Sequence, residues 1–147
     1  MKAVEIKKTG GPEVLELKDI KLADPSNGEV LIKQVAIGLN YIDTYHRSGL
    51  YPVPLPSGIG LEGAGIIEKV GSDTDGFNVG DKVCYAAAPI GSYATHRIYP
   101  TKSLVKVPDE IDLEIVAAIM TKGLTTFYLL HKTYEAKSGE TVLFHAA

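Results

Sequence analysis

Short segments separated by glycine and proline make up the first 108 residues, and this punctuation restricts the fold more than any other feature of the sequence. The 147 residues include 15 Gly and 8 Pro. Between these residues, β-branched and aromatic side chains alternate with polar ones, which is typical of strands in a barrel or a sandwich. The first part of the chain is therefore predicted to be mainly β.

Seven strands are predicted in this part, and turn-forming residues separate them: 3–7, 14–19, 30–37, 64–70, 82–86, 92–99 and 104–107. Gly, Asn, Asp and Ser at 25–28, 71–73 and 80–81 supply the turns. Residues 48–60 contain prolines at 52, 54 and 56, which lack the N–H that a central strand needs. This stretch is predicted to be a surface loop.

The pattern changes after Pro108 to that of an α/β segment. Asp112 is a plausible N-cap for a helix over 113–122 that stops at Gly123, and a second helix fits 125–134. The run 141–145 is apolar, like a parallel strand buried on both faces. Such a strand needs neighbours for its backbone hydrogen bonds, so we expect this chain to be the front portion of a longer protein.

Composition and charge exclude several classes of function. Lys and Arg number 15 against 18 Asp and Glu, which gives a net charge of −3 and no basic surface for nucleic acid or anionic lipid. No unbroken apolar run approaches the roughly 18 residues of a membrane span, and the N-terminus does not resemble a leader. A cytoplasmic protein without nucleic-acid or membrane partners is expected.

The segment Gly58–Gly63 matches the GxGxxG pattern of dinucleotide-binding loops. That mechanism requires the glycines to follow a strand and to open a helix, so that the pyrophosphate meets the helix N-terminus. Here a proline-rich loop precedes the glycines and strand-like sequence follows them. Close backbone packing at a corner of the barrel is the better interpretation.

Several segments, taken in order, resemble the zinc-free, zeta-crystallin-like quinone oxidoreductases of the medium-chain dehydrogenase/reductase superfamily. They lie at 38–51, 56–65, 79–83, 122–125 and 140–147. The resemblance implies a GroES-like, partly open β-barrel as the catalytic domain over 1–111. It also implies that 112–147 begin an NADPH-binding Rossmann domain with helices and a first strand, truncated before its glycine-rich loop.

The chemistry of the resembling positions argues against zinc. Zinc-dependent relatives have a cysteine where Asn40 stands and a histidine where Leu61 stands, and an amide with a leucine cannot replace them at a tetrahedral zinc. The single cysteine, Cys84, also excludes a disulfide within the chain and any zinc site of two or more thiolates. No metal is expected.

The resemblance implies that Asn40, Tyr45 and Tyr51 line the substrate cleft and that Thr125 faces the nicotinamide. Asn40 and Tyr45 would donate hydrogen bonds to the charge that develops on a quinone oxygen, and both would also touch the cofactor. Ordinary roles compete with these: an Asx turn for Asn40, tyrosine packing for Tyr45 and Tyr51, and a helix N-cap for Thr125. Two acidic residues have structural interpretations, Asp43 as the N-cap of a short helix through Arg47 and Glu62 as a structural carboxylate.

The leading hypothesis is that the parent protein transfers hydride from NADPH to quinones, while this chain alone is inactive. The apolar helices over 113–134 predict a homodimer. Three alternatives stay open: an NADPH-dependent enone reductase, a non-enzymatic GroES-like or crystallin-like binding module, and an RNA-binding protein. The negative charge argues against the last of these.

Overall fold

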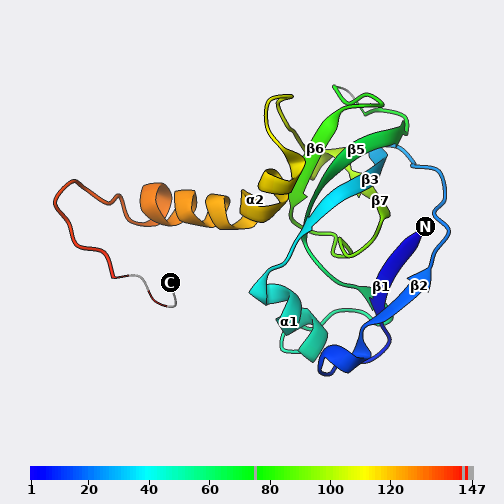
Figure 1. The fold of residues 1–147 in the computed structure, drawn as a ribbon, viewed down its shortest axis with the longest axis horizontal. Helices are drawn as coiled ribbons and strands as arrows, with labels where there is room; N and C mark the ends of the chain where they lie inside the picture. The colour runs from blue at the N-terminus through cyan, green and yellow to red at the C-terminus, as the bar shows by residue number, and fades with distance from the viewer. Residues whose placement is uncertain (75, 144, 146–147) are drawn as a thin grey trace.

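Two antiparallel sheets form the body of the molecule (Figure 1), in a computed structural model that describes residues 1–74, 76–143 and 145. The smaller sheet has the strand order β2-β1-β4, and its strands are β1 Lys2–Ile6, β2 Glu16–Asp19 and β4 Ser57–Gly58. The larger sheet has the order β7-β3-β5-β6-β8. Its strands are β3 Glu29–Gly38, β5 Glu62–Val70, β6 Lys82–Ala86, β7 His96–Pro100 and β8 Val105–Lys106.

Among the described residues, backbone hydrogen bonds link β1 of the smaller sheet to the segment 93–95, which leads into β7 of the larger sheet. The Val4 N–H donates to the Tyr93 carbonyl at 2.7 Å, and the Thr95 N–H donates to the Lys2 carbonyl at 2.8 Å. The sheets therefore curve around a common interior without closing into a continuous ladder. The predicted partly open, GroES-like β-barrel is confirmed.

Most predicted strands are present, and the differences arise where the backbone bonds outside a ladder. The strand predicted over 92–99 begins only at His96, because the Ser92 N–H instead donates to the Gly60 carbonyl. The strand predicted over 14–19 begins at Glu16, after a 3₁₀ turn η1 at Pro12–Val14. The predicted loop 48–60 contains the two-residue strand β4, and a second 3₁₀ turn, η2, spans Thr101–Ser103.

The glycines of the GxGxxG segment lie in close backbone contacts. Gly60 has a φ of +95°, and a Cβ there would overlap the Ser92 and Tyr93 side chains. The segment leads into strand β5 and not into a helix. The packing interpretation of these glycines therefore holds.

The barrel interior is filled by apolar side chains of the larger sheet: Val30, Ile32, Ile67, Val83, Tyr85, Tyr99 and Leu104. Tyr85 and Tyr99 stack with ring centroids 4.3 Å apart. Burial raises the pKa of Tyr85 to about 12, although the nearby Arg97 guanidinium opposes that rise. Both phenols therefore stay neutral and pack as part of the core.

Arg97 is buried against these two tyrosines. Its guanidinium carbon lies 4.8 Å from the Tyr85 ring centroid and 4.7 Å from that of Tyr99, within range of a cation–π interaction. Its Nη2 donates to the Pro89 carbonyl at 2.8 Å. No carboxylate among the described residues lies within 4.0 Å of it. Among the described residues, the positive charge is held by the two aromatic rings and by the carbonyls of Pro89 and Ile90.

Helix α1, Tyr41–Ser48, follows β3 directly and begins at Asn40, its N-cap. The expectation that Asp43 is the N-cap is wrong. Asp43 is the third residue of the helix, and its Oδ2 accepts the Asn40 backbone N–H at 3.0 Å. The helix starts three residues earlier than expected because this carboxylate satisfies the N-cap backbone from within the first turn. Gly49 ends the helix with a φ of +86°, as expected for a left-handed C-terminal residue.

Helix α2, Leu113–Tyr128, is continuous where two helices were predicted, and a π-helical segment, η3 Leu129–Thr133, extends it. Asp112 is its N-cap, as predicted, with Oδ1 accepting the Glu114 N–H at 2.9 Å. Gly123 does not stop the helix, because a glycine inside a helix costs only about 1 kcal/mol relative to alanine. The prediction of a second helix start near Thr125 is wrong.

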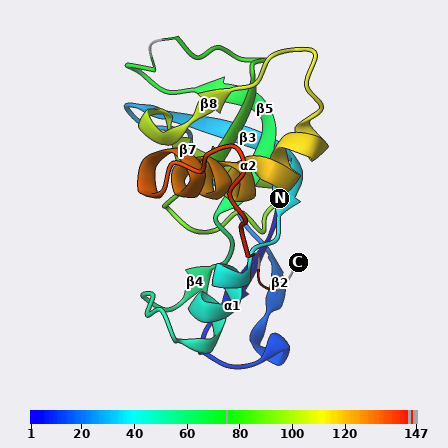
Figure 2. The same ribbon diagram turned by 90° about the vertical axis from the view of Figure 1, so that its left-hand side faces the viewer.

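One stripe of α2 packs on the barrel, and the rest of the helix is exposed. Leu113, Val116 and Ala117 are buried against Ala64 and Cys84. The far half of the helix projects away from the sheets, and Figure 2 shows it pointing toward the viewer with α1 below it. Large apolar side chains are exposed along the helix: Ile115, Ile119, Leu124, Phe127, Tyr128, Leu129 and Leu130.

The stretch Leu113–Thr133 is long and apolar enough to cross a membrane by length and composition. Helices that pack within soluble proteins pass the same test, so this property alone is weak evidence. Polar residues such as Thr121 and Lys122 lie within this stretch, so it is not an unbroken apolar run in the sequence.

The strand predicted over 141–145 is absent from the part of that segment which the structure describes. Residues 141–143 have no regular secondary structure, and Val142 and Leu143 are exposed. No other strand in the described chain lies beside them to take up their backbone hydrogen bonds. Residue 144 of the predicted strand, and residues 146 and 147 of the resembling segment 140–147, lie outside the described residues.

Candidate functional site

Asn40 stands where β3 ends and α1 begins, and its side-chain amide contacts residues of β5 and α2. Its Nδ2 donates to Glu62 Oε2 at 2.6 Å, and its Oδ1 lies 3.4 Å from the Lys122 ammonium. A carboxylate only accepts hydrogen bonds and an ammonium only donates them, so these two partners determine which end of the amide faces which residue. Asn40 is thus held in one orientation.

Glu62 is the centre of this arrangement. It is the first residue of β5 and is fully buried. While Oε2 accepts from Asn40, Oε1 accepts the backbone N–H of Thr121 in α2 at 2.7 Å. The Lys122 ammonium lies 4.0 Å from Oε2 and supplies the opposite charge. Asn40, Glu62, Thr121 and Lys122 are called the Glu62 network below; it joins β3, β5 and α2.

A glycine makes this network geometrically possible. A Cβ at Gly38 would overlap both Glu62 Oε2 and the carbonyl oxygen of Ala117 in α2. Gly38 therefore lets α2 approach β3 and β5 closely enough for the Thr121 N–H to reach the carboxylate. Thr121 Oγ1, buried beside this bond, has no hydrogen-bond partner in the part of the chain that the structure describes.

Tyrosines gather on α1 and the loop after it. The ring centroids of Tyr45 and Tyr51 are 5.2 Å apart in an edge-on arrangement, and Tyr41 meets Tyr45 at 5.4 Å. The ring of His46 lies 6.1 Å from that of Tyr51. The structure thus brings together two of the predicted site residues and adds Tyr41, which is 77% exposed and was not among them.

Asp43 fastens α1 to the barrel. The Tyr93 hydroxyl donates to Asp43 Oδ2 at 2.9 Å, and the same oxygen accepts the Asn40 backbone N–H. Burial and, after it, this bond to the Asp43 carboxylate raise the pKa of Tyr93, so its hydroxyl remains a donor. The Asp43 carboxylate therefore fixes the position of Asn40 relative to the sheets.

Thr125 lies one helical turn beyond Thr121, on the same side of α2. Its Oγ1 donates to the Thr121 carbonyl at 2.8 Å, and the neighbouring Thr126 bonds the Lys122 carbonyl in the same way. Neither threonine caps a helix. The Thr125 hydroxyl retains its acceptor lone pairs for a ligand, and its contact with a cofactor stays a prediction.

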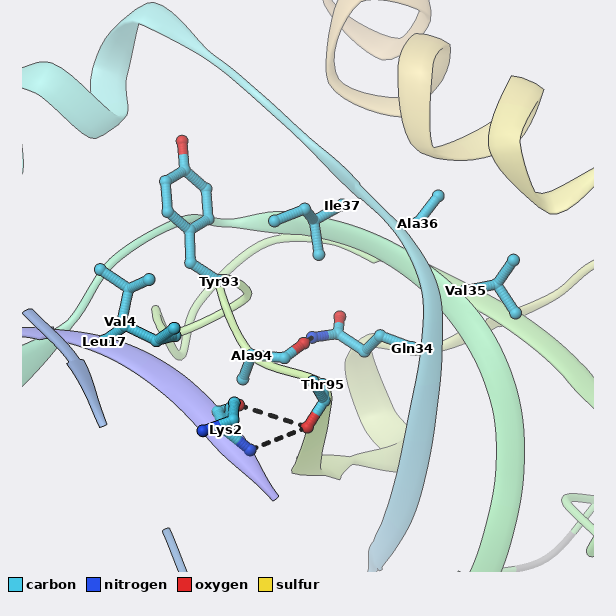
Figure 3. Close-up of a pocket in the computed structure, with 10 residues that line it drawn as sticks. All are labelled: Lys2, Val4, Leu17, Gln34, Val35, Ala36, Ile37, Tyr93, Ala94 and Thr95. Carbon is cyan, nitrogen blue, oxygen red and sulfur yellow. Dashed lines mark hydrogen bonds between the residues drawn. The ribbon is translucent and has the colours of Figure 1, made fainter. Parts of the chain in front are cut away.

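A groove of about 350 Å³ lies elsewhere, between the strands β1 and β2, strand β3 and the segment 93–95 (Figure 3). Val4, Leu17 and Ile37 make it apolar, and its Lys2 backbone is tied to the Thr95 hydroxyl. None of Asn40, Tyr45, Tyr51 and Thr125 lines it. The predicted site and this groove are therefore separate.

No cluster of three or more His, Cys, Asp or Glu suited to a metal ion occurs among residues 1–74, 76–143 and 145. Near the Glu62 network, burial first and the Glu62 charge second raise the pKa of Cys84 to about 11. The thiol is therefore neutral near pH 7, whereas metals bind the thiolate. That the parent protein works without zinc stays a prediction.

Sequence reasoning assigned Glu62 only a structural role and gave Lys122 no role in the site. A glutamate among glycines and a lysine before Gly123 carry little signal individually, because β5 and α2 are far apart in sequence. Their contact with Asn40 emerges only when the sheet and the helix are packed together.

The fold and this site define an alcohol dehydrogenase GroES-like domain. The family model of that description matches residues 26–109, more than half of the chain, and the chain belongs to this family.

Relatives within the family make the resemblance more specific. A quinone oxidoreductase of Pseudomonas aeruginosa is 55% identical over 99% of this chain and 45% of its own length. A 2-haloacrylate reductase of a Burkholderia species is 43% identical, also over 99% of this chain and 45% of its own length. The chain thus spans less than half the length of these relatives.

Solved structures agree with the sequence comparison. The Pseudomonas syringae quinone oxidoreductase matches 95% of this chain and 43% of its own, with a TM-score of 0.92 and 49% identity. The Escherichia coli quinone oxidoreductase, solved as a complex with NADPH, matches 93% of this chain and 42% of its own, with a TM-score of 0.91 and 46% identity. The predicted resemblance to quinone oxidoreductases is confirmed.

Proposed function

We propose that this chain is the substrate-side part of an enzyme that reduces quinones with NADPH. The observation that carries the proposal is the Asn40 amide, held by buried Glu62 and by Lys122 at the start of α1, the helix that also carries Tyr45. The similarity to quinone oxidoreductases supports the same function. Residues 1–111 would form the catalytic domain, and 112–147 would begin the NADPH-binding domain.

The residues present fit the nicotinamide end of NADPH. The nicotinamide carboxamide has a carbonyl oxygen that accepts hydrogen bonds and an NH2 group that donates them. Asn40 Nδ2 has a second hydrogen that Glu62 does not take, and the Thr125 hydroxyl one turn along α2 has free lone pairs. The cofactor, when bound, supplies the hydride. Asn40, Tyr45 and Thr125 would hold and orient it.

The site residues would position the acceptor and stabilise its developing charge. Tyr45 and Tyr51 present flat apolar rings with donor hydroxyls, which suit a planar quinone. Tyr45 would donate a hydrogen bond to the oxygen that becomes negative, and the one Asn40 Nδ2 hydrogen that Glu62 leaves free would be shared between this oxygen and the nicotinamide carboxamide. No step requires a metal Lewis acid, and holding both reactants together supplies much of the rate.

The full-length protein tests this function directly. We expect NADPH to be consumed in the presence of quinones, with slower consumption of NADH. Asn40→Ala should lower kcat/KM by about 10²-fold, in the range for removing one oxyanion donor, and Tyr45→Phe should also lower it. Unchanged quinone reduction in both variants would disprove the site. A full-length protein that did not oxidise NADPH with any of the quinones tested would favour the binding-module alternative.

Reduction of electron-poor carbon–carbon double bonds is the second candidate. The 43% identity to a 2-haloacrylate reductase favours it. The same donors would then stabilise an enolate oxygen in place of a quinol oxygen. Comparing kcat/KM for a quinone and an enone of similar size separates the two activities.

The exposed side of α2 would pack on the second domain of the longer protein. By itself this chain should neither bind NADPH tightly nor turn over, and sub-micromolar affinity in a titration would overturn that statement. The same apolar surface predicts a dimer of the 147-residue chain, to be checked by analytical ultracentrifugation. The parent protein is proposed to be a cytoplasmic homodimer that binds no nucleic acid or membrane.

A further inference from the structure

Lys122 lies at the boundary between the buried part of the Glu62 network and the surface. Its side chain is 59% exposed, whereas that of Glu62 is fully buried. Among the described residues it is the one cation within 4.0 Å of the Glu62 carboxylate. One side of the ammonium is therefore fixed by protein groups, and the other side is open.

The hydrogens of this ammonium are only partly used. An ammonium has three donor hydrogens, and Asn40 Oδ1, at 3.4 Å, is its one hydrogen-bond partner in the described chain. The uncommitted hydrogens lie next to the amide that the proposed function assigns to the acceptor. An anionic oxygen placed at Asn40 would thus also be within reach of Lys122.

The charges around Lys122 leave it free to act on a ligand. Glu62 is the one acidic group that faces it, from β5, and both Glu62 oxygens already accept short hydrogen bonds. Asn40, at the start of α1, is neutral. Cys84, on β6, faces Glu62 and is kept protonated by its raised pKa. Along α2, residues 118–126 contain no other ionisable side chain.

We propose that Lys122 is the catalytic proton donor of the reduction, an inference that rests on the proposed function. When bound, NADPH would supply a hydride, with its two electrons, to one quinone oxygen, and the second quinone oxygen would become a phenolate. A proton then moves from Lys122 Nζ to that phenolate. The products are the quinol, the oxidised nicotinamide and a neutral lysine amine, which takes up a proton from water.

Other residues in the site are less suited to this step. The Asn40 amide donates a hydrogen bond but does not give up a proton. Tyr45 can donate, yet its ring packs edge-on against Tyr41 and Tyr51, and no hydrogen bond in the described structure couples its hydroxyl to a charged group. Lys122 alone combines a mobile proton with a fixed position at Asn40.

Kinetics of the full-length protein give the first test. Lys122→Ala should lower kcat for quinone reduction by about 10²- to 10⁴-fold, the usual contribution of a general acid, with little change in the KM for NADPH. Methylamine added to Lys122→Ala should restore part of the activity. Lys122→Arg should keep the charge but transfer protons poorly, and Lys132→Ala, which removes another exposed lysine beyond α2, serves as the control.

A binding measurement gives a second test that does not depend on turnover. 4-Nitrophenol is a phenol whose ionised form absorbs visible light. Bound to the full-length protein loaded with oxidised cofactor, it should be more ionised in the wild-type protein than in Lys122→Ala at the same pH. Lys132→Ala should match the wild type.

The outcomes separate the two proposals. A wild-type protein that reduces neither quinones nor enones refutes the proposed function. An active wild type whose Lys122→Ala variant retains kcat within twofold refutes the proton donor. A loss of activity that methylamine does not restore, together with unchanged ionisation of the bound nitrophenol, also refutes it. If Lys122→Ala does not fold, as judged by its melting temperature, Lys122→Gln replaces it in both tests.

Discussion

Arg97 and Glu62 are both buried charges, but their surroundings differ. Arg97 lies inside the barrel against two aromatic rings and two backbone carbonyls, and no polar chain leads from its guanidinium to an exposed charge in the described structure. Glu62 lies where α2 meets the sheets and connects through Asn40 to exposed Lys122. Burial alone therefore does not identify a charged residue as functional. A chain of polar contacts from the buried group to the surface is the feature that supports a functional role.

The barrel side of this comparison should show the largest effect on stability. Tyr99→Ala removes a fully buried ring that stacks on Tyr85 and supports Arg97, and it should lower the free energy of unfolding by about 3–5 kcal/mol. Urea denaturation measures this loss. Tyr99→Phe loses only the hydroxyl bond to the Ala87 carbonyl and should cost about 1 kcal/mol. A loss in Tyr99→Ala below that of Tyr99→Phe would contradict the packing role.

Substitution of Glu62 should lower the free energy of unfolding less than Tyr99→Ala does, and it should lower the activity of the full-length protein more. Glu62→Ala leaves the Asn40 amide and the Thr121 N–H without their acceptor, which should cost about 1–3 kcal/mol in urea denaturation. In the full-length protein, kcat should fall as well, because Asn40 and Lys122 lose their common anchor. Glu68→Ala, on the same strand but half-exposed, should change stability by less than about 1 kcal/mol.

Alkaline pH should destabilise the fold through Cys84, close to the Glu62 network. The folded protein holds the pKa of this thiol at about 11, above its ordinary value of 9.0, because the charged form is disfavoured by burial. The stabilisation is complete below pH 9 and is lost as the pH rises toward 11, since the unfolded chain then releases the proton first. Thermal melts from pH 8 to 11 measure the trend. Cys84→Ala should make it shallower, although Tyr85 adds a similar loss between pH 10 and 12.

The smallest effect is expected from Arg97→Met. A buried cation without a carboxylate partner gains little net free energy from its position, because its desolvation offsets the cation–π and carbonyl contacts. An apolar chain of similar volume should change stability by about 1 kcal/mol or less, in either direction. Loss of more than about 3 kcal/mol would mean that the charge itself stabilises the barrel and would erase the distinction from Glu62.

The strands were predictable because their evidence is local. Alternating side chains and turn residues identify β3, β5 and β6 to within two residues, and Gly49 marks the end of α1 correctly. The wrong predictions concern elements whose extent depends on contacts between residues that are distant in sequence. Gly123 predicts a helix stop from the sequence alone, but its cost is smaller than the gain from extending a helix already packed at Leu113 and Val116.

The candidate site was only partly predictable for the same reason. Asn40, Tyr45 and Tyr51 were identified through resemblance, and the structure places Tyr45 beside Tyr51 on the helix that Asn40 caps. The link from Asn40 to Glu62 and Lys122 spans 22 and 82 positions in sequence. Residues so far apart in sequence give no periodic pattern. Which of them come into contact is determined by how the sheet and the helix pack together.

Helix α2 is held at Thr121, and α2 and η3 together continue for twelve residues to Thr133 with little support from the barrel. At 1.5 Å per residue, this unsupported length is roughly 18 Å. A rigid rod of that length converts a tilt of about 5° at its fixed point into a displacement of about 1.5 Å at its tip. The hydrogen bond between the Thr121 N–H and the Glu62 carboxylate is therefore the point about which the helix would pivot. A small movement of β5 would be magnified at the far end of the helix.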